Sequence, residues 1–297
     1  MDQIHLAFPL LSAFCYAASA LFLKAGSREG VGPVRTTVIV LWVMAFGFAI
    51  FYPWREFPVT PSVWWPSLVV GIAFLLGHLF LVLAYARGDV SVATPVMGTK
   101  VLMVAVLVSL FSEKGLGWGT WLSAIITTVA LILLVSPGKG MDGLPRKRVV
   151  AGFGYALATA ATFAVFDVMI QEFSARDGFG LLAPFAMGLA AFGSLFLLRF
   201  ARSRSFRFSP RAWKFLIPGI ILLTIQAMLL IWTIGAFGDA AGANITYSSR
   251  AIWSVVLVWI FGSFFGDRES LQDRTIVVRR LLGAIFMVIG ILLVFTT

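Results

Sequence analysis

The sequence predicts an all-α integral membrane protein, with ten transmembrane helices built as two inverted five-helix repeats. Three observations predict this fold class. The chain has 297 residues, of which 60% are hydrophobic and only 12% are charged, whereas soluble domains are about half apolar and about a quarter charged. The apolar residues gather in runs long enough to cross a bilayer. The second half of the chain also repeats features of the first.

Each apolar run is interpreted as one helix, because a backbone in lipid must satisfy its own hydrogen bonds and about 20 apolar residues cross the hydrocarbon core. The first run follows the short start MDQIH and ends before GVGP at 30–33, and the fifth ends at SPGKG, 136–140. DGFG at 177–180 separates the sixth run from the seventh. The ten predicted spans are 5–24, 36–53, 63–86, 90–112, 117–136, 150–171, 179–200, 213–236, 240–265 and 278–296.

The distribution of Lys and Arg predicts the orientation in the membrane. Of the 23 cationic residues, 18 lie in or beside the connections after spans 1, 3, 5, 7 and 9, and three lie on the other side. Cytoplasmic loops carry the excess of positive charge, so these connections are expected to be cytoplasmic and both termini external, in a multi-pass cell (inner) membrane protein. The net charge of +10 is assigned to this membrane surface and not to nucleic acid.

An internal repeat divides the chain into residues 1–148 and 149–297. With a shift of 150, residues 88–111 and 238–261 share seven of 24 positions, including Gly88 and Asp89, and Lys100 falls on Arg250. A shift of 148 places His78 on Gln226. Each half holds five predicted spans, so the second half enters the membrane from the opposite side. Many secondary transporters have this inverted repeat, with the substrate site near the midplane between the repeats.

Two cations are predicted at the middle of the membrane. Lys100 lies about 10 residues into its span, or roughly 15 Å deep in a core of about 30 Å, and Arg250 is equally deep. Each costs about 2.5–3.5 kcal/mol to insert, so each requires a partner or a water-filled site. Asp167 is the candidate partner of either cation. A second cation would then remain to bind an anionic group. The alternative is that both cations are structural.

Further polar residues are candidates for the same site. Tyr247 and Ser249 precede Arg250, and Tyr16 lies on a polar-tinged face of span 1. His78 and Gln226 lie in spans 3 and 8, where polar side chains also serve as hydrogen-bonding links between helices. The predicted substrate-binding residues are Lys100, Arg250, Tyr247, His78, Gln226, Tyr16 and Ser249. Asp167 and His78 are candidates for proton coupling, since histidine titrates near neutral pH.

The segment GDVSVATPVMGTKVLMVAVLVSLFSEKGLGWGTWLSAIITTVALILLV (88–135), its second copy and the closing helix LLGAIFMVIGILLVF together resemble the EamA-like ten-span proteins of the drug/metabolite transporter superfamily. Glu113, and Asp267 or Glu269, match an acidic position of that pattern. The sequence departs from it at Lys100 and Arg250, where those proteins usually carry prolines. Sugar-phosphate and nucleotide-sugar members of the superfamily carry cations there that hold phosphate groups, so the resemblance implies an anionic substrate group.

The function predicted is secondary transport of a small organic metabolite by alternating access, with a carboxylate or phosphate held at the midplane. The alternative is a transporter for a neutral or cationic metabolite or drug. An intramembrane enzyme or a channel is more remote, because an enzyme needs paired catalytic groups at one depth. The expected partners are the lipid bilayer, the solute and, as a candidate coupling ion, the proton. No enzymatic activity, cofactor, metal site or nucleic-acid partner is expected, and no oligomeric state is predicted.

Overall fold

The computed structural model describes residues 3–53, 61–87, 90–112, 115–135, 146–201, 206–261 and 274–296. Within these ranges every regular element is a helix. The elements are η1 (Gln3–Leu6), α1 (Ala7–Arg28), α2 (Pro33–Phe48), η2 (Ala49–Phe51), α3 (Pro61–Arg87), α4 (Val90–Met97), α5 (Lys100–Phe111), α6 (Trp118–Val135), α7 (Arg146–Asp177), α8 (Phe179–Ser194), η4 (Leu195–Phe200), α9 (Pro210–Phe237), α10 (Ala240–Tyr247), α11 (Arg250–Phe261) and α12 (Arg274–Val294).

Helical structure lies in each of the ten ranges predicted to span the membrane. Seven helical segments of the described chain are long and apolar enough to cross a bilayer, and Trp118–Leu134 is a shorter apolar helix. The all-helical fold is therefore confirmed, and the ten spans stay a prediction. Glu113, Asp267 and Glu269, which the family resemblance singled out, lie outside the described residues.

Local sequence signals explain several helix boundaries. Pro33 follows Gly32 at the start of α2, and Pro210 follows Ser209 at the start of α9, where a fixed φ favours the first turn. The Ser209 hydroxyl accepts a hydrogen bond from the Ala212 N–H at 3.1 Å. At the other end of α9, Gly238 adopts the left-handed conformation (φ 67°) that terminates a helix.

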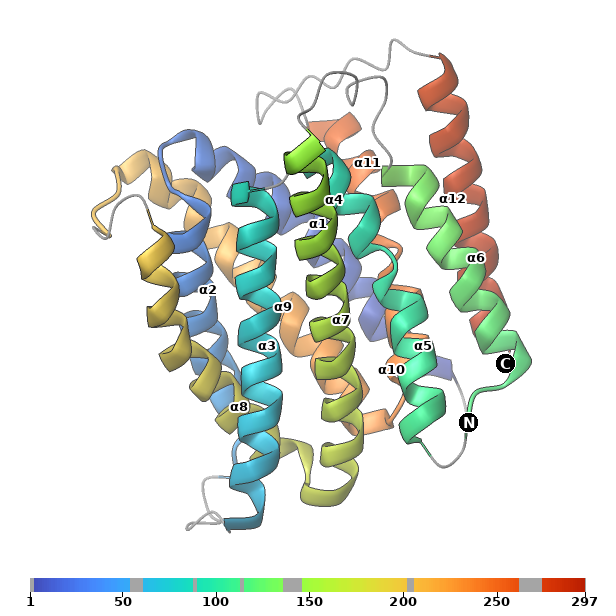
Figure 1. Cartoon of the computed structure of the whole chain (residues 1–297), viewed down its shortest axis with the longest axis horizontal. Helices are drawn as coiled ribbons and strands as arrows, with labels where there is room; N and C mark the ends of the chain where they lie inside the picture. The colour runs from blue at the N-terminus through green and yellow to red at the C-terminus, as the bar shows by residue number, and fades with distance from the viewer. Residues whose placement is uncertain are drawn as a thin grey trace.

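The helices pack in pairs that join distant parts of the chain. Helix α1 lies along α9, α3 lies along α7, α2 contacts α8, and α6 lies along α12. Figure 1 shows the last pair side by side at one edge of the molecule. Every one of these pairs joins a helix from the first half to one from the second. The two halves are thus interlocked, and α7 contacts α3, α4 and α5 of the first half.

Two of the predicted spans are broken near their middles, where a continuous helix was expected. Helix α4 ends at Met97 and α5 begins at Lys100, and α10 ends at Tyr247 and α11 begins at Arg250. Pro95 lies in the last turn before the first break, and at the break the Thr99 hydroxyl donates to the Val96 carbonyl at 2.7 Å. In the second, Ser248 donates through its hydroxyl to the Asn244 carbonyl at 2.8 Å, a bond that bends helices. At both breaks the backbone tightens into i→i−3 hydrogen bonds.

Two of the basic residues that the sequence assigned to one side of the membrane join neighbouring elements of the fold. Arg211 at the start of α9 pairs with Glu29 just after α1, with 3.2 Å between Nε and Oε1. Arg87 at the end of α3 donates to the Tyr155 hydroxyl near the start of α7 at 3.1 Å. In Figure 1 the α1–α2 connection lies at the top of the view, and the ends marked N and C lie at the lower right.

The close packing of α3 on α8 requires a glycine at position 71, and this requirement can be tested. A Cβ at this position would lie 2.7 Å from the Ala186 carbonyl oxygen and 3.1 Å from the Leu189 Cβ. The backbone of α8 cannot yield as a flexible side chain would, so Gly71→Ala is expected to destabilise the protein by about 1–3 kcal/mol. The measurement is thermal unfolding of the detergent-purified protein. The matched control is Gly188→Ala in α8, which has open space around it; equal losses for both variants would contradict this packing.

Candidate functional site

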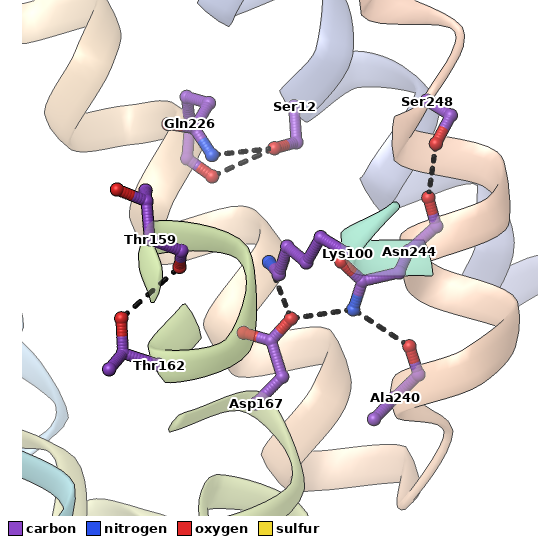
Figure 2. A network of polar contacts seen from close by, with 9 residues as sticks. All are labelled: Ser12, Lys100, Thr159, Thr162, Asp167, Gln226, Ala240, Asn244 and Ser248. Atoms are coloured by element: carbon purple, nitrogen blue, oxygen red, sulfur yellow. Dashed lines mark hydrogen bonds and ion pairs between the residues drawn. The ribbon is translucent and has the colours of Figure 1, made fainter. Parts of the chain in front are cut away.

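A single buried carboxylate connects three helices at the centre of the protein. Asp167 of α7 is 1% exposed. Its Oδ2 lies 2.6 Å from the Lys100 Nζ of α5, and the Asn244 Nδ2 of α10 donates to the same oxygen at 2.7 Å. Figure 2 shows Lys100 and Asn244 converging on Asp167 from different helices. The sequence left open which cation Asp167 meets, and in the structure it is Lys100.

The position of Lys100 makes this pairing necessary. Lys100 is the first residue of α5, where the partial positive charge of a helix N-terminus disfavours a cation. Its side chain is 15% exposed, so water screens it little. The Nζ also lies 5.8 Å from the centre of the Phe163 ring. The Asp167 carboxylate therefore offsets both the burial of the ammonium and the unfavourable helix dipole.

Arg250 has a different environment from Lys100, although both begin the second half of a broken span. Its guanidinium carbon lies 4.4 Å from the centre of the Tyr247 ring and 5.4 Å from that of Tyr16. The two rings contact each other edge to face, with centres 6.0 Å apart. In the described part of the chain no carboxylate lies within ion-pair distance of Arg250. Aromatic rings attract a cation but carry no charge to neutralise it.

The two cations belong to neighbouring clusters. Asn244, which bonds Asp167, and Tyr247, which faces Arg250, lie three residues apart on α10. Lys100, Asp167 and Arg250, the described ionised groups of these two clusters, together carry one net positive charge.

Small hydroxyl groups lie beside Arg250. Ser249 is 5% exposed, and its hydroxyl has no hydrogen-bond partner among the described residues. The same holds for the fully buried Thr246 hydroxyl. Ser254 instead donates to the Arg250 carbonyl at 2.8 Å and so satisfies the backbone of its own helix. Ser249 and Thr246 thus hold hydroxyl groups without hydrogen-bond partners among the described residues, in the segment that precedes Arg250.

His78 and Gln226 both have hydrogen-bond partners, His78 within its own helix α3 and Gln226 across to α1. The His78 Nδ1 lies 3.0 Å from the Phe74 carbonyl oxygen, and its ring meets Phe163 edge to face at 5.2 Å. Gln226 Nε2 lies 3.4 Å from the Ser12 hydroxyl, which donates to the Gln226 carbonyl at 2.9 Å, so this pair ties α9 to α1 (Figure 2). The Phe163 ring lies between His78 and Lys100, in contact with both.

The predicted residues thus form two adjacent groups and two separate contacts. Lys100 and Asp167 form one group, and Arg250, Tyr16 and Tyr247 form the other. Asn244 and Phe163 complete these groups and were not predicted as site residues. Asn244 lies in the largely polar segment 244–249, and its contact with Asp167 depends on the packing of α10 on α7. Within the described ranges, no three His, Cys, Asp or Glu side chains gather as a metal site would require.

The Lys100–Asp167 pair predicts strongly coupled effects of substitution on stability. Removing one partner of a buried pair leaves an uncompensated charge, at a cost of about 3–5 kcal/mol. Lys100→Met and Asp167→Asn are each expected to destabilise the protein by that amount, and the double variant by clearly less than the sum. The measurement is a double-mutant cycle from the thermal unfolding of purified protein.

A surface pair supplies the control for this cycle. Arg176 contacts Asp177 at 2.8 Å, and the Arg176 side chain is 59% exposed, so Arg176→Gln is expected to leave the unfolding midpoint nearly unchanged. Additive losses for Lys100→Met and Asp167→Asn would show that the two groups do not stabilise each other.

Comparison with solved structures supports the fold alone. One solved structure, described only as "Crystal structure of protein", aligns with 99% of this chain and 96% of its own chain, with a TM-score of 0.72 and 16% sequence identity. It is one of 27 solved chains that match. A search of curated proteins finds no match.

A comparison with family models identifies the first half of the chain. The matched segment, residues 4–136, contains Lys100 and the break between α4 and α5. The resemblance inferred from the sequence is confirmed: over residues 4–136 the chain matches the EamA-like transporter family, which belongs to the drug/metabolite transporter superfamily, and the match supports a membrane transporter of that family in general.

Proposed function

We propose that the protein is a secondary transporter for a small organic metabolite, and that Arg250 binds an anionic group of that metabolite. The observation that supports this proposal most directly is the environment of Arg250. It is a half-buried cation at a helix break, faced by Tyr16 and Tyr247 and without a carboxylate partner among the described residues. A guanidinium holds a carboxylate or phosphate through two parallel hydrogen bonds. Ser249 offers a further donor beside it.

The proposed architecture is ten spans in two inverted repeats, residues 1–148 and 149–297. Three features support it. The helix breaks before Lys100 and Arg250 lie 150 residues apart, as the sequence repeat requires. The pairing of α1 with α9 has a counterpart in the pairing of α7 with α3, when the halves are exchanged. Arg211 also pairs with Glu29 across the connections that follow α1 and precede α9, two connections predicted to lie on the same side.

Alternating access follows from this architecture as part of the proposal. The site lies between elements of both halves, since Lys100 belongs to the first half and Asp167, Asn244 and Arg250 to the second. Rocking of one half against the other would expose such a site to each side in turn. We also propose the proton as coupling ion, with Asp167 as the carrier that releases Lys100 when protonated. His78, next to Phe163, is a second candidate for that role.

A neutral or cationic metabolite is the alternative substrate. The Lys100–Asp167 pair favours this alternative in one respect: Lys100 already has a partner and does not need an anionic solute. Arg250 has no ion-pair partner among the described residues, and this favours an anionic substrate. An intramembrane enzyme is disfavoured by the family match, since transporters are not usually enzymes. A channel differs from a carrier in lacking saturation and counterflow.

The proposed function predicts anion transport that depends on Arg250. Protein reconstituted in liposomes is assayed for uptake and counterflow of a panel of anionic, neutral and cationic solutes, including carboxylates and phosphate esters. Arg250→Gln is expected to lower anion transport by about tenfold to a hundredfold, because a charge-assisted hydrogen bond contributes about 1.5–3 kcal/mol. Arg250→Lys should restore part of it, as a point charge without the guanidinium fork.

The exposed Arg176→Gln is the matched control, since it removes a cation of the same kind away from the centre. Lys100→Gln is tested beside it. Transport of cations that survives both Arg250→Gln and Lys100→Gln, with no anion carried, would favour the alternative. Flux that neither saturates nor shows counterflow would indicate a channel.

The proposed orientation places both termini outside the cell (inner) membrane and the connections after spans 1, 3, 5, 7 and 9 in the cytoplasm. Cysteines introduced at exposed ends of helices test it, in a Cys15→Ser background that removes the single native cysteine. Thr296→Cys is expected to react with a membrane-impermeant maleimide added to spheroplasts, and Ser27→Cys only after lysis. The opposite labelling pattern would contradict the positive-inside prediction.

A further inference from the structure

We infer that the central site is specific for a group with a single negative charge, such as one carboxylate, over dianionic solutes such as phosphate monoesters and dicarboxylates. The inference rests on the proposed function and adds the charge class of its substrate. The sequence offered two cations for an anion, Lys100 and Arg250. The structure divides them, because Asp167 neutralises the first and leaves the second.

Lys100 is unavailable to a solute while its pair with Asp167 is intact. The Nζ to Oδ2 distance is 2.6 Å, and the Asp167 side chain is 2% exposed. Asn244 holds the same carboxylate oxygen at 2.7 Å and is itself fixed by a bond from its Nδ2 to the Ala240 carbonyl at 2.9 Å. A solute that recruited Lys100 would leave Asp167 with the Asn244 amide as its remaining hydrogen-bond partner among the described residues. Exposing an unpaired buried carboxylate in this way is strongly unfavourable.

Arg250 is built to receive one anionic group. Tyr16 and Tyr247 cover its guanidinium with aromatic rings, and this contact leaves the N–H donors of the guanidinium edge without a carboxylate in the described part of the chain. Such an edge matches the two oxygens of one carboxylate. The buried Ser249 hydroxyl, which is unpartnered among the described residues, adds one donor nearby.

The net charge then selects between anions. Lys100, Asp167 and Arg250 together carry one positive charge, so a monoanion makes the occupied centre neutral. A dianion makes it negative, in surroundings where an unbalanced charge costs about 2.5–3.5 kcal/mol. Because each 1.4 kcal/mol is a factor of ten in affinity, the preference for the monoanion is expected to be about tenfold to a hundredfold.

The experiment compares probes of matched shape that differ by one charge. Succinamate is compared with succinate, and phthalamate with phthalate, at pH 7.5, in binding to wild-type protein and in inhibition of transport by the reconstituted protein. The monoamide of each pair is expected to bind about tenfold to a hundredfold tighter than the diacid. This comparison uses the wild-type protein and does not depend on the folding of any variant.

Asp167→Asn then tests the cause of the preference. The variant frees Lys100 and raises the net charge of the centre to two positive charges. The ratio of affinities is expected to shift toward the diacid by about tenfold or more, whereas Asp167→Glu keeps the carboxylate and should keep the wild-type ratio. Affinity ratios within one variant are insensitive to the fraction of protein that is folded.

The outcomes separate this inference from the proposed function. Equal affinities of wild-type protein for the monoamides and the diacids, both lost in Arg250→Gln, would overturn the charge specificity and leave anion transport standing. An unchanged ratio in Asp167→Asn would also overturn it. No binding of any of the four probes to wild-type protein, together with no anion transport in the solute panel, would overturn the proposed function and this inference with it.

Discussion

The cost of burying charge in a membrane protein is the constraint on which the centre of this structure depends. Lys100 lies at a helix N-terminus, where the dipole disfavours a cation. Asp167 compensates it at 2.6 Å, and Asn244 completes the coordination of the carboxylate. The same three residues join α5, α7 and α10, so the interaction that makes the lysine tolerable also fixes both halves of the chain against each other.

The two helix breaks position the charged residues of the candidate site. Each break interrupts a predicted span near its middle and places a cation at the first residue of the following helix. At each break a hydroxyl group bonds back to a backbone carbonyl, from Thr99 to Val96 in the first and from Ser248 to Asn244 in the second. The two cations have different contacts: Lys100 forms an ion pair with Asp167, and Arg250 lies against the rings of Tyr16 and Tyr247. Under the proposed function, the first of these cations is structural and the second is available to a ligand.

In this fold, the residues that allow the helices to pack closely differ from the residues of the candidate site. Close contacts through small residues, such as Gly71 against Ala186, require the absence of a side chain. They do not specify what the centre binds. A solved structure with only 16% identity shares the fold along nearly the whole chain. The functional assignment therefore rests on the family match over residues 4–136 and on the residues of the site.

The hydropathy pattern and the internal repeat alone determined the all-helical membrane class and the ranges that contain helices. They also identified Lys100 and Arg250 as charged residues in the middle of predicted spans. These are local or periodic properties of the sequence. They also narrowed the partner of Lys100 or Arg250 to Asp167. Only the tertiary structure decided that Lys100 takes the carboxylate, that Asn244 shares it, and that Tyr16 and Tyr247 enclose Arg250. The physical reason is that ion pairing depends on distances of a few ångströms between residues far apart in the chain, which helix packing sets.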